Sequence, residues 1–205
     1  MTDNQSTPYK LYMLLLGSKA PQRNVEQHDF YFGIARSLKE LLPDIKAFWP
    51  EAGNSIHLDG WREVTLVDGF QVSVLSKSEN ESPNGPKLFF INLGGYQTGK
   101  LEEQHYTVLG VYDDRTQAMQ MAKKTVFYRE QSVKGMKGAN SHIDEKYGID
   151  VDDVYRVEDI LSANHKHQFQ IHLTPASDST DDVIHLGYIT LDKLSKQPDF
   201  PVDLP

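Results

Sequence analysis

Two nearly continuous runs of apolar residues stand out in the chain, at positions 11–16 and 88–93, and a glycine follows each run. A short apolar run bounded by polar residues and glycine is typical of a buried β-strand. A second segment rich in aromatic and β-branched residues follows each run, at 30–35 and at 106–112. Such residues favour strands. The pattern therefore predicts one pair of strands near the start of the chain and another pair near its middle.

The two strand pairs belong to a longer internal repeat. The segment at 10–18 recurs 77 positions later, at 87–95. Two polar motifs recur as well, Glu-x-His with the same displacement of 77 and His-x-Asp with a displacement of 85. Their residues are Glu26, His28, His57 and Asp59 in the first copy and Glu103, His105, His142 and Asp144 in the second. Copies that keep polar as well as apolar residues indicate a tandem duplication.

One helix is predicted in each copy, after the second strand. In the first copy an apolar stripe at 38–49 has helical spacing, but Pro43 interrupts it. Proline removes a hydrogen-bond donor and restricts the residue before it. We therefore expect a helical turn before Pro43 and a second segment that ends before Pro50. In the second copy Asp113 or Asp114 is expected to cap the helix.

Further strands follow in the pattern. An Asp-Gly pair at 68–69 between the apolar runs 64–67 and 70–74 predicts a hairpin with a two-residue turn. Two more strands are predicted at 169–173 and 183–190. Strands that follow one another in this way favour antiparallel pairing.

The predicted fold class is α+β, with a largely antiparallel sheet. We expect a tandem duplication of a strand-strand-helix-strand unit, with the two units in a pseudo-two-fold arrangement. The predicted divisions are a first repeat unit at 10–75, a linker at 76–86, a second repeat unit with the C-terminal strands at 87–191, and an extended tail at 195–205. Turn-forming residues define the linker, and three prolines define the tail.

Composition excludes several classes of function. The net charge of -8, from 21 basic and 29 acidic residues, repels phosphate groups, so neither nucleic acid nor a membrane is predicted as a partner. The absence of cysteine excludes disulfides and thiolate metal sites and favours a cytoplasmic protein. The run at 11–16 resembles a short signal sequence, but its recurrence in mid-chain argues for a strand instead.

The duplicated polar motifs are the strongest candidates for a functional site. Residues i and i+2 of a strand share a face about 7 Å apart, so each motif places a carboxylate beside an imidazole. One interpretation is a divalent metal bound through nitrogen and oxygen ligands in each copy, and acid/base catalysis would use the same residues. The simpler interpretation is that each histidine donates to a backbone carbonyl or a carboxylate and fixes a loop. We favour it because no recognised metal spacing is present, and no metal ligand is assigned.

The rest of the chain offers no nucleophile for covalent catalysis, since it has no cysteine and no Gly-x-Ser-x-Gly elbow. The strand-end glycines Gly17 and Gly94 could offer backbone amides to an anion, but such glycines more often let the chain turn. His165 and His167 are predicted on one face of a strand and His172 on the other. We expect these three histidines to face solvent or a partner.

The repeated motifs, taken together, resemble the bacterial domain-of-unknown-function family numbered 1543. In the second copy they read Lys-Leu-Phe-Phe-Ile-Asn-Leu-Gly-Gly at 87–95, Glu-Glu-Gln-His-Tyr at 102–106 and Ser-His-Ile-Asp at 141–144, and in the first copy they lie at 10–18, 26–29 and 57–59. The resemblance implies a two-copy member of the family over about residues 10–161, with a bacterial origin. It implies no activity, substrate or catalytic residue.

The leading functional hypothesis is a non-catalytic cytoplasmic protein that binds a ligand or interacts with a protein partner. The alternative is a metal-dependent or acid/base enzyme that uses the duplicated motifs, so the sequence leaves enzymatic activity open. All eight motif residues are candidate ligand-binding residues. The cofactor, the identity of the small ligand or protein partner, and the oligomeric state, a homo-oligomer included, stay open as well.

Overall fold

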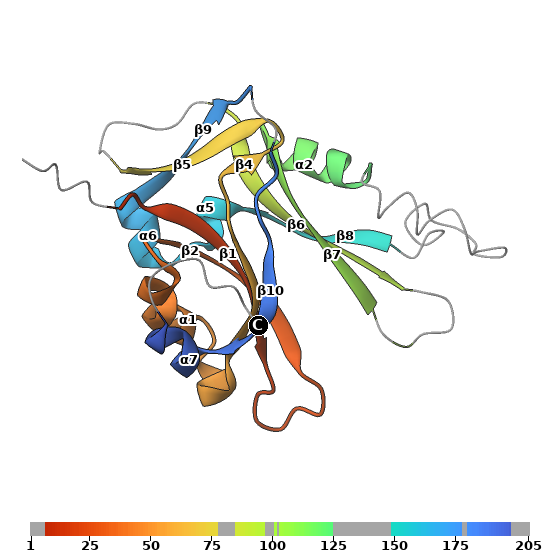
Figure 1. Cartoon of the computed structure of the whole chain (residues 1–205). Coiled ribbons are helices and arrows are strands. Elements are labelled where there is room, and N and C mark those ends of the chain that lie inside the picture. Colours follow the sequence, from red (N-terminus) through yellow and green to blue (C-terminus); the bar gives the residue numbers. More distant parts are fainter. Residues whose placement is uncertain are drawn as a thin grey trace, which may run out of the picture. The chain divides into compact units, whose positions relative to one another are not determined.

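The structure is a computed structural model that describes residues 7–77, 85–96, 101, 103–124, 149–177 and 180–197. The chain divides into two compact units. Unit 1 comprises Met1–Glu81 and Leu161–Pro205, and unit 2 comprises Ser82–Ile160. The end of the chain therefore returns to the unit in which the chain begins, as the red and dark blue elements of Figure 1 show.

The main sheet of unit 1 has four antiparallel strands in the order β10-β3-β1-β2. These strands are β1 (Lys10–Ser18), β2 (Gln27–Ala35), β3 (His57–Glu63) and β10 (His185–Thr190). The apolar run of β1 lies near the centre of the sheet, where Leu14 and Leu16 are fully buried. The predicted strand at the start of the chain is therefore confirmed, with its glycine inside the strand rather than beyond it.

A smaller antiparallel sheet of unit 1 has the order β4-β5-β9. Its strands are β4 (Leu66–Val67), β5 (Phe70–Ser76) and β9 (Phe169–Pro175). Asp68 and Gly69, with φ of 50° and 76°, form the two-residue turn between β4 and β5. Both residues adopt the left-handed region that such hairpin turns require. The predicted Asp-Gly hairpin is confirmed.

Short helices pack against the main sheet of unit 1. They are the 3-10 helices η1 (Leu38–Leu41) and η2 (Pro50–Ser55) and the α-helices α1 (Leu42–Phe48), α6 (Ala163–Gln168) and α7 (Leu191–Lys196). Pro43 lies in the first turn of α1, where its missing N–H would have no partner. The predicted division of this helical region at Pro43 is thus confirmed. No helix in the described part of the chain is long and apolar enough to cross a membrane.

Unit 2 has a three-stranded antiparallel sheet in the order β7-β6-β8. Its elements are β6 (Lys87–Tyr96), β7 (Glu103–Tyr112), α2 (Arg115–Ala122), β8 (Ile149–Arg156) and α5 (Val157–Ile160). Ala118 and Ala122 of α2 are fully buried against Phe89 and Ile91 of β6. Asp114 caps α2, since its side chain accepts a hydrogen bond from the Gln117 backbone N–H at 2.8 Å. The predicted cap is confirmed.

The two units share a strand order and a register. In both, the first strand of the unit lies between the second and the third, as β2-β1-β3 and as β7-β6-β8. The pair Gly17 and His28 of unit 1 has its counterpart in Gly94 and His105 of unit 2. The third strand carries an irregularity in register at the same place in both units. The mixed α+β class with antiparallel sheets is therefore confirmed.

The predicted assignment of the C-terminal strands to the second repeat was wrong. β9 pairs with β5, and β10 pairs with β3, so both strands complete the sheets of unit 1. The buried side chains of Ile189, Leu191 and Leu194 join the core of unit 1. The physical reason is that β3 and β5 each expose an edge that the N-terminal segment alone leaves unpaired.

The predicted extended tail was also wrong at its start. Ser195 and Lys196 belong to α7, whose first turn is capped by Thr190 through a hydrogen bond from the Lys193 backbone N–H at 3.3 Å. Positions 198–205 of the tail and 78–84 of the linker lie outside the described residues. Of the linker, Ser76 ends β5 and is therefore part of the sheet.

His165 was expected on an exposed strand, but it lies in α6 and is buried. The backbone N–H of Ile34 donates to its Nδ1 at 3.4 Å, and its Nε2 lies 3.2 Å from Oδ2 of Asp44. The ring therefore accepts a hydrogen bond at Nδ1 and has a carboxylate beside Nε2, which suits an imidazole with its proton on Nε2. Burial lowers the pKa of His165, and the nearby Asp44 carboxylate partly opposes that effect.

Unit 1 is expected to lose stability when the pH falls below the ordinary histidine range. The pKa of His165 is lower in the folded protein than in the unfolded chain, so the unfolded chain takes up the proton first. The contribution is complete above about pH 6.5 and falls as the pH approaches the folded pKa. Urea unfolding at about pH 7.5 and about pH 5 should show a larger loss in the wild type than in His165→Gln. Parallel losses in the two proteins would contradict this role.

Candidate functional site

Three neighbouring strands bring the candidate residues of unit 1 into one row across the main sheet. Gly17 of β1 lies opposite His28 of β2 and opposite His57 of β3. Residues that face each other across antiparallel strands point to the same side of the sheet, so both imidazoles flank a position that has no side chain. Glu26, directly before β2 and two residues from His28, brings its carboxylate to His57.

A β-bulge places Asp59 over the glycine of this row. The register between β1 and β3 shifts between Leu15 and Leu16, which leaves Asp59 as the extra residue of β3. Bulges re-aim side chains in this way. A Cβ at Gly17 would overlap with the carboxylate of Asp59 and with the ring of His57. Glycine is therefore required at position 17 because the two polar side chains occupy the space above it.

The two motifs of the first copy converge, and we name Glu26, His28, His57 and Asp59 together the His–carboxylate cluster. The Nε2 atom of His57 lies 2.9 Å from Oε1 of Glu26 and 3.4 Å from Oδ1 of Asp59. Its Nδ1 lies 3.1 Å from the carbonyl oxygen of Ser55. The Nε2 atom of His28 lies 3.2 Å from Oδ2 of Asp59. Both ring nitrogens of His57 thus face oxygen atoms.

The cluster has a buried base and an open rim. The side chain of His57 is only 5% exposed, whereas those of His28 and Glu26 are 47% and 45% exposed. The ring of Tyr188, from β10, lies 4.4 Å from the His57 ring. Oδ2 of Asp59 is buried, and no group within the described residues donates a hydrogen bond to it. His28 lies at an ion-pair distance from this oxygen but does not form a hydrogen bond with it.

No group of three or more His, Cys, Asp or Glu side chains in the described parts of the chain has the arrangement of a metal site. The contacts of His57 instead link β3 to the Ser55 carbonyl and to the segment before β2. The contact with the Ser55 carbonyl is a hydrogen bond, and the two carboxylates lie at ion-pair distances from the imidazole. The simpler interpretation of the motifs, in which each histidine contacts a carbonyl or a carboxylate, accounts for these distances.

Unit 2 carries a more open version of the cluster. Asp152 lies at the irregularity of β8, and a Cβ at Gly94 would overlap with its carboxylate. Nδ1 of His105 lies 3.5 Å from Oδ2 of Asp152, and Nε2 lies 3.8 Å from Oε2 of Glu103. The side-chain nitrogen of Asn92 lies 3.4 Å from Oδ2 of Asp152. The His105 side chain is 50% exposed, close to the 47% of its counterpart His28, and Asp150 takes the strand position that the buried His57 has in unit 1.

In unit 2 other residues occupy the strand positions that the His-x-Asp motif has in unit 1. Asp150 and Asp152 of β8 stand where His57 and Asp59 stand in β3. The equivalent residues of these two strands are therefore 93 positions apart in the sequence, whereas the two His-x-Asp motifs are 85 positions apart. The sequence between α2 and β8 is long enough to carry the motif without placing it in the strand. His142 and Asp144 themselves lie outside the described residues.

Comparison with known families identifies part of the chain. Residues 23–74 match the family model of the Domain of Unknown Function (DUF1543). The resemblance inferred from the motifs is thereby confirmed for this segment, which contains all four residues of the His–carboxylate cluster. No curated protein matches the chain.

A solved structure shares the fold over most of the chain. The crystal structure of a protein Il1583 from Idiomarina loihiensis superimposes with a TM-score of 0.61 over 89% of this chain and 97% of that chain, at 22% sequence identity. At this identity the likeness concerns the fold alone. The chemistry of the DUF1543 segment must therefore be argued from its own residues.

Sequence reasoning missed two parts of the site. It treated Gly17 and Gly94 as strand ends, although the recurrence of glycine at one position of both copies was a signal of a required small residue. It also passed over Asp152, which the acidic pair at 150 and 152 could have indicated. Both omissions depend on the bulge, which brings an acidic residue over a glycine on the neighbouring strand.

Proposed function

We propose that this protein is a non-catalytic binding protein whose His–carboxylate cluster holds an organic cation, a protonated amine or a guanidinium group. The observation that carries the proposal is the convergence of Glu26 and Asp59 beside a half-exposed rim. Among the described residues neither carboxylate forms an ion pair with lysine or arginine. Their contacts are with His28 and His57, which leave oxygen lone pairs for an incoming donor.

Charge favours a cation at this place. With histidine counted as neutral, the two carboxylates of Glu26 and Asp59 give the cluster a formal charge of -2. A cation at about 4 Å from one carboxylate near a protein surface gains about 1–4 kcal/mol. The low solvent exposure of Asp59 raises this gain, because partly buried charges are screened less by salt.

Hydrogen bonding favours an organic cation over a bare metal ion. An ammonium or guanidinium group brings several N–H donors, whereas the buried Oδ2 of Asp59 lacks a donor among the described residues. The Tyr188 ring beside His57 adds an aromatic surface, which attracts organic cations. Within the described residues, no three His, Cys, Asp or Glu side chains are arranged to hold a metal ion.

We also propose that the two units arose by tandem duplication. The shared strand order, the glycine opposite a histidine and the displaced aspartate support this origin. The pseudo-two-fold arrangement of the units, the bacterial origin and the cytoplasmic location stay predictions. The open cluster of unit 2 would then be a second, weaker site of the same chemistry.

Binding of L-arginine amide, followed by ¹⁵N–¹H NMR titration, tests the proposed function. The amide signals of Gly17, His28 and Asp59 are expected to shift. Glu26→Gln and Asp59→Asn are each expected to weaken binding at least about tenfold, which corresponds to about 1.4 kcal/mol. Raising the salt from about 0.01 M to about 0.15 M should weaken binding further, since the interaction is electrostatic.

Asp68→Asn is the matched control for these variants. It removes the same charge from unit 1, and asparagine accepts the positive φ of the turn between β4 and β5. Binding to this variant should equal that of the wild type. Equal weakening in Asp68→Asn and Glu26→Gln, or shifts confined to residues away from Gly17, would overturn the proposal.

Acid/base catalysis is the second candidate, and one contact favours it. Asp59 lies against the half-exposed ring of His28, as the orienting carboxylate of a general base would. The buried His57 is less accessible to a substrate. If His28 is the general base, His28→Gln should abolish turnover of a substrate once one is identified, and binding of L-arginine amide should persist. The binding proposal does not require this outcome.

A further inference from the structure

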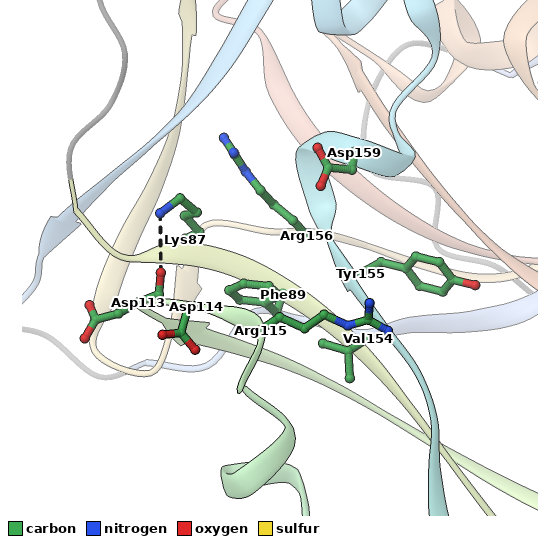
Figure 2. Close-up of a pocket in the computed structure, with 9 residues that line it drawn as sticks. All are labelled: Lys87, Phe89, Asp113, Asp114, Arg115, Val154, Tyr155, Arg156 and Asp159. Carbon is green, nitrogen blue, oxygen red and sulfur yellow. Dashed lines mark hydrogen bonds between the residues drawn. The ribbon is translucent and has the colours of Figure 1, made fainter. Parts of the chain in front are cut away.

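Unit 2 contains a pocket of about 460 Å³ between β6, β8 and the start of α2. Phe89 and Val154 form part of its wall, and the charged side chains of Lys87, Arg115 and Arg156 reach it (Figure 2). The pocket is built from residues outside the duplicated Glu-x-His and His-x-Asp motifs. It therefore requires an explanation separate from that of the His–carboxylate cluster.

The strand registers show that unit 2 has a positively charged side chain at a pocket position where unit 1 has a negatively charged one. Tyr12 of β1 lies opposite Glu63 of β3, and Phe89 of β6 lies opposite Arg156 of β8. In unit 1 the ammonium group of Lys10 forms an ion pair with Glu63 at 2.7 Å. At the equivalent place of unit 2 the lysine has an arginine as its neighbour.

This change places two cations on one face of the sheet. Lys87 and Phe89 are two residues apart on β6, and Arg156 is opposite Phe89, so all three side chains share a face. Figure 2 shows the side chains of Lys87 and Arg156 extending in the same direction from their strands. Like charges so placed repel each other, and an anion between them would remove the repulsion.

Lys87 and Arg156 both have N–H groups that could donate hydrogen bonds to an anion. The ammonium of Lys87 donates to two backbone carbonyls, those of Gly85 at 3.4 Å and Asp113 at 3.3 Å. Arg156 forms an ion pair with Glu158 through Nη2. Its Nε is buried and has no acceptor among the described residues. A buried N–H without an acceptor is costly, so an acceptor supplied by a ligand would stabilise this end of β8.

The carboxylates at the pocket do not replace such a ligand. Asp114 is engaged as the cap of α2, and the backbone N–H of Asp113 donates to the Gln117 side chain. Figure 2 shows the carboxylates of Asp113 and Asp114 turned away from Arg156, whereas that of Asp159 points from α5 toward the side of Arg156. The ion pair of Arg156 is with Glu158, and among the described residues it has none with Asp159. The hydrogen-bonding groups at the start of α2 thus have partners within the protein. The side chains of Lys87 and Arg156 form the positively charged end of the pocket.

We infer that this pocket of unit 2 binds a small aromatic anion, with its carboxylate or phosphate group held by Lys87 and Arg156 and its ring against Phe89 and Val154. Arginine donates two parallel N–H bonds to such a group, and lysine adds a compact charge. The apolar wall accepts the ring by burial of apolar surface. The site is independent of the cation site proposed for unit 1.

Titration of the full chain with phenyl phosphate and, separately, with benzoate tests this inference by ¹⁵N–¹H NMR. Signals of Phe89, Arg115 and Arg156 are expected to shift with at least one of the two probes, and the probe that binds more tightly identifies the anionic group. Arg156→Glu recreates the lysine–glutamate pair of unit 1 and is expected to weaken binding at least about tenfold. The neutral Arg156→Gln should show an intermediate loss.

Lys193→Glu is the matched control, since it makes the same change in charge on the exposed face of α7 in unit 1. It should bind the probes as the wild type does. Unchanged binding in Arg156→Glu, or failure of both probes to shift the pocket residues, would overturn the inference. Inorganic phosphate that binds as tightly as phenyl phosphate would equally overturn the assignment of a ring to Phe89. Asp59→Asn should leave all probe binding intact, which separates this test from that of the cation site.

Discussion

Replacing Ile189 by alanine is expected to lower the free energy of unfolding of unit 1 by about 2–5 kcal/mol. Ile189 lies on β10, is only 2% exposed and packs in the core of unit 1. It lies opposite Leu58, which is fully buried on β3. Truncation would leave a cavity where β10 closes the main sheet. Urea unfolding followed by circular dichroism or tryptophan fluorescence measures the loss, because both tryptophans, Trp49 and Trp61, lie in unit 1.

Leu186→Ala provides the control on the same strand. Leu186 is 70% exposed, so its truncation should change stability by no more than about 0.5 kcal/mol. The two variants remove similar numbers of carbon atoms from β10 and differ mainly in burial. A wild-type midpoint for Ile189→Ala would mean that the C-terminal segment is not part of the core of unit 1.

The return of the chain to unit 1 is the feature that the sequence predicted least well. The pattern at 169–173 and 183–190 correctly predicts strands, but it does not name their partners. Neighbouring strands in sequence are usually neighbours in space, and this expectation assigned both strands to the second repeat. Here β3 and β5 have free edges that only the end of the chain fills. A one-dimensional pattern carries no information about such an unpaired edge.

Local features were predicted better because their causes are local. The Asp-Gly turn follows from the positive φ that residues 68 and 69 must adopt. The break at Pro43 follows from a missing donor, and the cap at Asp114 follows from an unpaired backbone N–H. His165 shows the opposite case. Its spacing suggested an exposed strand, whereas a contact with Asp44, far away in sequence, buries it.

The candidate site was predictable in its polar residues and not in its shape. Repetition alone singled out Glu26, His28, His57 and Asp59, and the structure brings these four side chains together. The bulge that lifts Asp59 over the neighbouring strand has no sequence signature in this chain. For the same reason the sequence placed the second His-x-Asp motif at 142–144 rather than recognising the acidic pair in β8.

The two units share one arrangement of three strands and differ in charge. Unit 1 has an imidazole at the base of its cluster and an acidic partner for Lys10. Unit 2 has an open cluster and an arginine beside Lys87. These differences lie at equivalent positions of the three corresponding strands in each unit. The two proposed ligand chemistries would follow from these differences alone, because the strands fix the positions and only the side chains differ.

Gly17→Ala is expected to destabilise unit 1 by about 1–3 kcal/mol, the usual range for overpacking a filled site. It is also expected to abolish binding of L-arginine amide. A methyl group at this position overlaps with the ring of His57 and the carboxylate of Asp59, so one or both must move. His57 is enclosed by Glu26, Tyr188 and the Ser55 carbonyl, and displacement therefore breaks contacts on every side.

Gly69→Asn tests whether the effect is specific to the space above Gly17. Nothing lies within 4 Å of a Cβ at Gly69, and asparagine is accepted at the positive φ of 76° in the turn between β4 and β5. Its unfolding midpoint and its affinity for L-arginine amide should remain close to those of the wild type. Gly17→Ala that retains full affinity would separate the cluster from the proposed cation site. Loss of affinity in a folded Gly17→Ala protein, judged by unshifted signals of the β4-β5-β9 sheet of unit 1, would tie binding to the position of His57 and Asp59 over the strand.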